Sequence, residues 1–484
     1  MRLNLQPISN VLGVLIIIIG VSILACIPVS LYHQSGDAGA LFKSGCVAMV
    51  CGILAWKYKF KSNAEVTKRE GYLIVVLGWV AMAIFSALPY YISGFTTSIT
   101  DAWFESISGL TTTGASIFSD IEFIPKGLLF WRSFTQWIGG MGIIVLTVAL
   151  FPLLGIAGIE LFVAEAPGPT SDKLHPRIKE TAKRLWFIYV GLTILLFVIL
   201  MLEGMSGYDA INHAMTTMAT GGFSTKNSSM AYYSSPLIQY TIIFFMILAG
   251  TNYTIIYYFF KRKFEKVIGS DEWRMYISVL LLATLAVTGG IVISSTLGIE
   301  ESFRGALFTV VSLVTTTGFV TIDYTAFSGF VILVCFILLF VGACAGSTSG
   351  GIKLIRHLVF FKNSLLEFKR ILHPRAMIRI KVNKQVVPPR ILTHILVFLL
   401  IYLITFVIGT ILVTMMGLDF MTALGSVATS LGNVGPGIGD VGPVDNFAHL
   451  SIGIKWVLSI IMLMGRLELF TVLVLFTPYF WKAN

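Results

Sequence analysis

The sequence predicts an all-α polytopic membrane protein in which four tandem helix–pore-loop–helix repeats surround one pseudo-fourfold pore. Three observations predict this fold: a strongly apolar composition, apolar runs of membrane-spanning length, and one glycine pattern that occurs four times. Of the 484 residues, 56% are hydrophobic and only 12% are charged, whereas soluble domains carry about 25% charged residues. The apolar runs have the length of about 20 residues that a helix needs to cross the hydrocarbon.

The repeated pattern is anchored by four glycines that lie 108, 96 and 117 residues apart. An alanine stands twelve positions before each glycine, a serine or threonine six before, and a threonine or asparagine two before. Each copy reads as a short helix that ends in a polar turn, and each lies between two long apolar stretches. Repetition of this kind predicts one pore assembled from four similar units. The anchoring glycines are Gly114, Gly222, Gly318 and Gly435.

Two apolar runs, near 10–32 and 39–57, come first and are predicted as an extra pair of membrane helices. Each repeat then supplies an outer helix, a half-membrane pore helix and an inner helix, so we expect ten membrane helices and four pore helices. In the first repeat these lie near 71–93, 101–112 and 128–154, and a proline-bearing, charged linker follows at 164–184. The predicted units are 1–70, 71–184, 185–274, 275–390 and 391–484.

The net charge is +10. The distribution of the basic residues along the chain indicates how the chain is oriented in the membrane, and does not indicate binding to nucleic acid. All but seven of the 34 Lys and Arg fall in segments that ten crossings place on one side, including 57–69, 173–184, 261–274 and 353–390. The positive-inside rule then predicts that both termini are cytoplasmic and that the four glycine turns open from the outside. The five cysteines lie in apolar surroundings without metal-type spacing and are interpreted as packing residues.

The pore helices and their turns carry the predicted chemistry. Asp101 and Asp209 stand one residue before the repeated alanine, where a helix N-cap is expected. The helices run inward, so their partly negative C-terminal ends would converge on the axis and favour a cation there. The glycines would let backbone carbonyls point into the pore. Glycine kinks that serve helix packing are the simpler alternative, but four in register favour a pore.

Two further features lie where an inner helix is expected. Ten small residues at 342–351 interrupt the third inner helix, which predicts a flexible gate loop below the filter; a close-packed helix seam is the alternative. Arg466 is a charge inside an apolar helix. It is either a positive barrier on the axis or part of an internal ion pair with Glu468 or Glu105, and the sequence favours neither. The predicted gating residues are Gly346, Ser347, Thr348, Ser349, Gly350, Gly351 and Arg466.

One polar position in the pore helices is a candidate for a catalytic site. His213 occupies the position that is filled by Glu105, Thr309 and Ser426 in the other repeats. A polar position shared by four repeats predicts a structural hydrogen bond behind the filter. The sequence contains no convincing nucleophile–base pair or metal-ligand cluster, so we expect that the protein is not an enzyme and holds no cofactor.

At these residues the chain resembles the Trk/Ktr/HKT superfamily of potassium transporters, and within it the bacterial TrkH proteins. The resemblance covers nearly the whole length and is highly specific. It includes the two extra N-terminal helices and rests on the motifs at 111–115, 132–142, 219–225, 346–348, 432–437 and 465–468.

The resemblance implies a homodimer in a bacterial cytoplasmic membrane, with one K⁺ pathway in each protomer. It also implies a cytosolic regulatory partner of the RCK type, which would bind ATP, ADP or NAD. The gate loop would be 342–351, with Ser349 where glycine is expected, and Arg466 would constrict the pathway. Gly114 would favour K⁺, because serine there marks Na⁺-preferring relatives. The ion-coordinating turns would be Thr112-Thr113-Gly114, Thr220-Gly221-Gly222, Thr316-Thr317-Gly318 and Asn433-Val434-Gly435.

Three other functions remain open on the sequence. A symporter that couples K⁺ to H⁺ or Na⁺ would need a titratable or second-ion site, for which Glu105, Glu468 and His213 are weak candidates. An intramembrane enzyme would need a buried nucleophile and base. A structural or receptor role predicts that replacing the filter glycines affects assembly and not flux.

Overall fold

The structure is a computed structural model that describes residues 5–57, 68–150 and 178–482. The predicted linker at 164–184 and the basic stretch at 57–69 fall largely outside the described residues. Nearly all the described elements are helices, and a single two-stranded hairpin, β1 (Lys381–Val382) with β2 (Gln385–Val386), is the one sheet in the described ranges.

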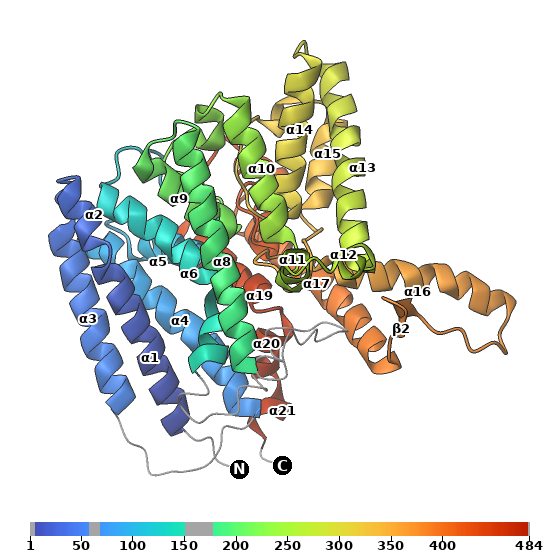
Figure 1. Ribbon diagram of the computed structural model, residues 1–484. Helices are drawn as coiled ribbons and strands as arrows, with labels where there is room; N and C mark the ends of the chain where they lie inside the picture. Colours follow the sequence, from blue (N-terminus) through green and yellow to red (C-terminus); the bar gives the residue numbers. More distant parts are fainter. Residues whose placement is uncertain (1–4, 58–67, 151–177, 483–484) are drawn as a thin grey trace.

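The N-terminal pair of helices packs by close backbone contact. α1 (Leu5–Leu24) continues into the short α2 (Ile27–Tyr32) and lies against α3 (Ala38–Lys57) and α4. Glycines allow this approach: a Cβ at Gly13 would lie 2.7 Å from the carbonyl oxygen of Gly52, and one at Gly20 would lie 3.0 Å from the backbone nitrogen of Met49. Small residues at helix contacts are typical of membrane proteins. The pair forms one side of the bundle (Figure 1).

Four units follow, and each contains an outer helix, a shorter pore helix and an inner helix. The first is α4 (Lys68–Ile92), α5 (Ile99–Leu110) and α6 (Lys126–Leu150). The second is α8 (Ile178–Leu202), α9 (Gly207–Met218) and α10 (Pro236–Gly250) with α11 (Tyr253–Phe260). The third is α13 (Asp271–Ser294), α14 (Ile299–Val314) and α15 (Gly329–Leu338). The fourth is α17 (Pro389–Met415), α18 (Phe420–Gly432) and α19 (Ile452–Arg466) with α20 (Phe470–Leu473).

The four units are arranged in a cycle. The inner helix of one unit packs against the pore helix of the next: α6 contacts α9, α10 contacts α14, and α19 closes the cycle on α5. Between the third and fourth units the contact is made by the segment after α15, where a Cβ at Gly350 would lie 2.7 Å from the Cβ of Asn433. This order places the C-terminal ends of the pore helices around one axis.

The first, second and fourth inner helices also depart from a straight helix, whereas the sequence predicted an interruption only in the third. The chain bends by 107° between α10 and α11 and by 111° between α19 and the segment that begins with α20. α6 has non-helical backbone at Gly142. In the described ranges, six helices are long and apolar enough to cross a membrane, or eight if each bent pair counts as one span. The predicted ten membrane helices therefore stay a prediction.

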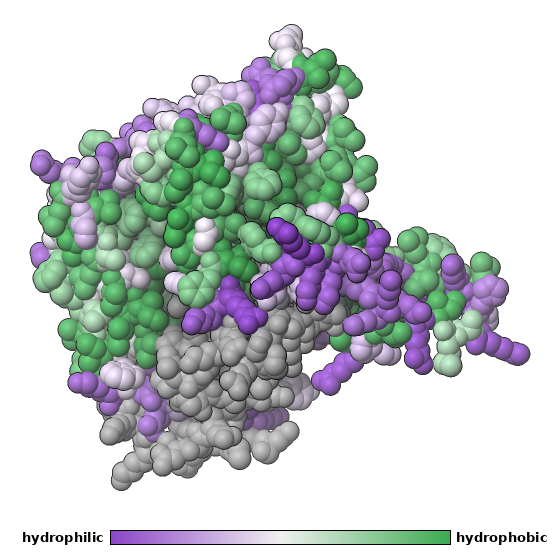
Figure 2. Space-filling view, in the orientation of Figure 1, coloured by the Kyte–Doolittle hydropathy of each residue, from purple (hydrophilic) through white to green (hydrophobic). Residues whose placement is uncertain are grey.

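α16 (Leu354–Leu372) and the β1–β2 hairpin project sideways from the bundle (Figure 1). They share a small core of their own with the start of α17, built around Val359, Ile380 and Val382. Figure 2 shows hydrophilic side chains gathered over this projection and the neighbouring α12 (Phe264–Ile268), whereas the flank of the bundle is largely hydrophobic. The short helices η1 (Ser229–Tyr232), η2 (Tyr324–Ala326) and η3 (Val474–Phe476) lie in connections, and α21 (Pro478–Trp481) is the last helix that the structure describes.

Candidate functional site: four turns around one axis

The first two pore helices begin with side-chain caps, but not those that the sequence predicted. Ser98 and Ser206 are the N-caps of α5 and α9, and their hydroxyls accept bonds from the backbone N–H groups of Asp101 and Asp209. The two aspartates therefore lie three residues inside the helices, and their assignment as N-caps was wrong. The pattern Ser-x-x-Asp resembles a capping box, in which the acidic residue stands in the first turn. Asp101 instead forms an ion pair with Lys455 at 2.7 Å.

The fourth pore helix does begin at an aspartate. The carboxylate of Asp419 accepts a bond of 3.0 Å from the N–H of Thr422. This hydrogen bonding by Thr422 lowers the pKa of Asp419. The charge therefore lies at the positive end of the helix, which is the favourable end for a carboxylate.

All four pore helices end in the same hydrogen-bonded turn. The residue two before each glycine adopts a left-handed conformation, with φ of 51°, 51°, 56° and 53°. The following N–H bonds to the carbonyl five residues earlier in every copy, as Thr113 does to Ser108 at 2.9 Å. This pattern is the Schellman motif, but a β-branched residue at positive φ is strained. The four left-handed residues are Thr112, Thr220, Thr316 and Asn433.

The four turns meet in a closed ring. A Cβ at Gly114 would clash with the carbonyl oxygen of Gly221, and the same relation joins the second turn to the third, the third to the fourth and the fourth back to the first. The glycines have φ between 78° and 104°, so a side chain is disfavoured by both backbone conformation and space. The glycine and carbonyl pairs are Gly114 with Gly221, Gly222 with Thr317, Gly318 with Val434, and Gly435 with Thr113.

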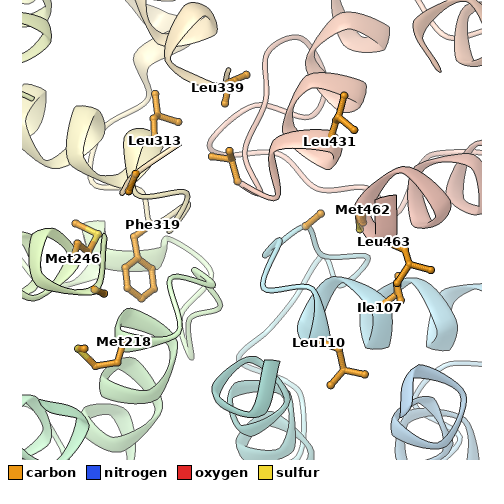
Figure 3. Close-up of a cluster of buried hydrophobic side chains, with 14 of the residues drawn as sticks. Ile107, Leu110, Met218, Met246, Leu313, Phe319, Leu339, Leu431, Met462 and Leu463 are labelled. Carbon is orange, nitrogen blue, oxygen red and sulfur yellow. The ribbon is translucent and has the colours of Figure 1, made fainter. Parts of the chain in front are cut away.

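Hydrophobic side chains surround this ring on its outer side. Figure 3 shows the ends of the pore helices from four parts of the sequence around a common centre, with Leu110, Met218, Leu313 and Leu431 packed away from that centre. The turns are therefore held in an apolar shell while their own atoms are polar. Irregular backbone at this depth is tolerated only where it is buried in protein or lines water.

Side-chain hydrogen bonds brace the first, third and fourth turns. The Oγ1 atoms of Thr111 and Thr113 lie 2.8 Å apart, and those of Thr315 and Thr317 lie 2.7 Å apart. The Nδ2 of Asn433 donates to Thr113 Oγ1 at 3.0 Å, so the fourth turn is tied to the first. Two buried oxygens, Thr112 Oγ1 and Asn433 Oδ1, have no protein hydrogen-bond partner in the part of the chain that the structure describes.

Neutral oxygens are the chemical groups that this ring offers. In the described ranges, no group of three or more His, Cys, Asp or Glu side chains is placed to hold a metal ion. Carbonyl and hydroxyl oxygens suit a hard monovalent cation, whose hydration shell they replace. The structure therefore brings together all twelve predicted filter residues.

The polar position behind the filter is structural in the first two repeats. Glu105 is fully buried and accepts a bond of 2.5 Å from Arg132 Nε and one of 3.0 Å from the N–H of Ile117. His213 bonds to the carbonyl of Asp209 at 2.8 Å and to Ser224 Oγ at 2.9 Å. The interpretation of His213 as a structural residue agrees with these contacts.

Arg132 gives a prediction about stability. Replacing Arg132 with methionine is expected to destabilise the protein by about 3–5 kcal/mol, because the buried carboxylate of Glu105 would lose its partner. The measurement is denaturant-induced unfolding of the purified protein in detergent micelles. The double variant Glu105→Gln with Arg132→Met should recover most of the loss. Equal stability of Arg132→Met and the original protein would show that this pair is dispensable.

The small-residue segment 342–351 forms a loop directly beneath the ring. Thr348 Oγ1 donates to the carbonyl of Met218 at 3.0 Å, and its N–H bonds to the carbonyl of Ala249. The N–H of Gly350 donates to Thr316 Oγ1 at 2.7 Å, which connects the loop to the third turn. The loop thus contacts the second and third repeats, and Gly350 also touches the fourth at Asn433.

Ser349, the residue that departs from the expected glycine, is accommodated by local bonds. Its hydroxyl lies 2.8 Å from that of Ser347, and both its carbonyl and its hydroxyl accept bonds from the buried Lys353. The side chain therefore anchors the loop to the start of α16.

Arg466 lies at the end of α19 and contacts the two neighbouring repeats, the third and the first. Its Nη1 donates to the carbonyl of Thr348 at 2.9 Å, and its Nη2 donates to the carbonyl of Gly139 at 2.5 Å. The two carboxylates considered as its partners pair elsewhere, because Glu468 binds Arg356 and Glu105 binds Arg132. Arg466 therefore connects the loop beneath the ring to the first inner helix.

These observations define a predominantly helical membrane protein in which four turns surround one candidate cation site. Comparison with known proteins gives the family: a sequence model of TrkH, described as a cation transport protein, matches residues 39–282 and 273–482. The chain belongs to the TrkH family. It is 40% identical to the Trk system potassium uptake protein TrkH of Escherichia coli K12, over 99% of this chain and all of that protein.

Two further relatives agree with this assignment. Trk system potassium uptake protein TrkG of Escherichia coli K12 is 33% identical, over 99% of both chains. The crystal structure of the potassium transporter TrkH from Vibrio parahaemolyticus superposes with a TM-score of 0.89, at 36% identity, and covers 99% of this chain and all of that one.

Proposed function

We propose that this protein takes up K⁺ across the bacterial cytoplasmic membrane through the ring of four turns. The observation that carries the proposal is the closed cycle in which each filter glycine faces the carbonyl of the next turn. Four converging helix C-termini favour a cation at this position. The TrkH and TrkG relatives are potassium uptake proteins, which supports K⁺ as the cation.

The filter consists of residues 112–114, 220–222, 316–318 and 433–435, and the gate of the loop 342–351 with Arg466. The loop is well placed for this role because it lies under the ring and bonds to Thr316 and Met218. Arg466 contributes a positive charge against the same loop at Thr348. Opening then requires the loop to give up these contacts.

The weak candidates for ion coupling are already engaged in other contacts. Glu105 is paired with Arg132, Glu468 with Arg356, and both ring nitrogens of His213 are hydrogen-bonded. This favours a passive pore over a symporter that couples K⁺ to H⁺ or Na⁺. An enzyme is disfavoured for the same reason, because these groups are not free to act as base or nucleophile.

The protein acts as a homodimer with a cytosolic partner of the RCK type, which binds ATP, ADP or NAD; no cofactor is assigned to this chain itself. The projecting α16 supports both contacts. Phe361, Leu365, Phe368 and Leu372 are each more than half exposed and follow one another at helical spacing, which suits a second protomer. The hairpin and α12 carry the basic residues Lys266, Lys381 and Lys384, and hydrophilic side chains gather over this part of the molecule (Figure 2). By the positive-inside rule, this side is cytoplasmic.

Flux through the purified protein in liposomes tests the proposal. Under an imposed membrane potential, with matched K⁺ and Na⁺ gradients, we expect passive flux that prefers K⁺. Flux that requires a proton or sodium gradient would replace the pore with a symporter. Flux without preference between K⁺ and Na⁺ would contradict the assignment of the four turns as a selectivity filter.

Shortening the loop gives a second prediction. Deleting Gly346 and Ser347 is expected to leave the pore constitutively active, because Thr348 and Gly350 could no longer reach their partners together. The measurement is K⁺ flux without the cytosolic partner, compared with the full-length loop. A variant that folds but remains tightly closed would contradict the assignment of the gate.

A further inference from the structure

The second filter turn differs from the first and third in what holds it. Turns one and three each contain a pair of threonines whose hydroxyls bond to one another. The equivalent residues of turn two are Ala219 and Gly221, which carry no hydroxyl. Turn two therefore needs another source of hydrogen bonds for a buried, strained segment.

Gln136 supplies those bonds from the first repeat. It lies on α6 and is fully buried. Its Nε2 donates to the carbonyl of Gly221 at 2.5 Å, and its Oε1 accepts from the N–H of Phe223 at 3.1 Å. The amide thus binds the turn at two points on either side of Gly222, with its donor and its acceptor both used.

The space around Gly221 fits this side chain closely. A Cβ on Gly221 would clash with the amide carbon of Gln136. Gly221 does not have a positive φ, so its backbone would accept another residue if Gln136 were absent. The absence of a side chain at Gly221 thus makes room for the amide of Gln136. The amide fills the space that a threonine side chain takes at the equivalent position of turns one and three.

We propose that Gln136 is the positioning residue that sets the geometry of the second filter turn and thereby contributes to the choice between K⁺ and Na⁺. The inference rests on the proposed function. The carbonyl of Gly221 is the oxygen that faces Gly114 in the ring. By fixing this carbonyl, an inner-helix residue of one repeat controls an ion ligand of the next.

The test compares K⁺ and Na⁺ flux in liposomes for Gln136→Leu and Gln136→Glu. Leucine removes both bonds, and a glutamate carboxylate can accept from Phe223 but cannot donate to Gly221. We expect a roughly tenfold fall in the K⁺/Na⁺ permeability ratio for Gln136→Glu, the factor expected from one lost hydrogen bond, and at least as large a fall for Gln136→Leu. Gln239→Leu is the matched control: Gln239 is also buried, but it bonds to Tyr233 and Arg304 and to no filter turn, so its ratio should not change.

A variant with a rebuilt second turn distinguishes a role of Gln136 in positioning that turn from a role in the stability of the protein alone. The triple variant Gln136→Ala, Ala219→Thr, Gly221→Thr recreates the hydroxyl pair of turns one and three, and should restore most of the K⁺ preference that Gln136→Leu loses. An unchanged ratio in Gln136→Leu or Gln136→Glu, at the original unfolding temperature, would overturn the inference. If leucine prevents folding, the glutamate and triple variants decide it. Absence of K⁺ preference in the unmodified protein would instead contradict the proposed function.

Discussion

Replacing Gly114 with serine is expected to lower the K⁺/Na⁺ permeability ratio by about tenfold or more. Gly114 has a φ of 82° and its missing side chain faces the carbonyl of Gly221. A residue with a side chain in this conformation costs about 1–3 kcal/mol, and each 1.4 kcal/mol changes an equilibrium about tenfold. The turn must shift to relieve the clash, and the ring of oxygens would shift with it. The ratio is measured from flux in liposomes.

A glycine of the same repeat provides the control. Gly94 has a similar φ of 72°, but a Cβ there would meet no atom within 4 Å. Gly94→Ser therefore carries comparable backbone strain without touching the ring, and its ion ratio should match that of the original protein. If Gly114→Ser also kept the original ratio, the first turn would not line the pathway.

Replacing Arg466 with alanine is expected to raise K⁺ flux about tenfold or more. The substitution removes a positive charge beneath the ring, and a unit charge at about 8 Å opposes a cation by about 2 kcal/mol at an effective dielectric constant of 20. It also removes the bonds from Arg466 to Thr348 and Gly139, which hold the loop against the first inner helix. The measurement is the initial rate of K⁺ flux per protein.

Arg466→Lys separates the two contributions. Lysine keeps the charge but cannot span both carbonyls as the forked guanidinium does. Low flux in Arg466→Lys would assign the effect to charge, and high flux would assign it to the tether. Loss of flux with poor folding in Arg466→Ala would show instead that Arg466 is mainly structural.

The repeat pattern predicted the ring of four turns because the conformation of each turn depends on residues that are close together in the sequence. Gly114, Gly222, Gly318 and Gly435 each lie in the polar turn that ends a short helix, and glycine suits the positive φ of that position. The N-caps were misplaced because Ser98 and Asp101 are both good first-turn residues, and the sequence does not say which one begins the helix. The left-handed threonines could not be predicted, because β-branched residues disfavour that conformation and only the ring imposes it.

The bends in the inner helices could be predicted from the sequence only in part. Asn252 accepts a bond from the N–H of Thr254 and begins α11, which is a recognisable helix start after Gly250. The bend at Glu468 and Leu469 has no glycine or proline, and both residues have positive φ. Its cause is tertiary: Glu468 is drawn to Arg356, which is more than a hundred positions away in the chain. Gln136 was likewise visible in the sequence, but its partner at Gly221 was not.

The most direct test of the central claim is to locate a heavy potassium analogue in the protein. Crystals grown with Rb⁺ or Tl⁺ in place of K⁺ should show anomalous density on the axis, within coordination distance of the carbonyl oxygens of Thr113, Gly221, Thr317 and Val434. Anomalous density elsewhere, with none inside this ring at ion concentrations that support flux, would contradict the account.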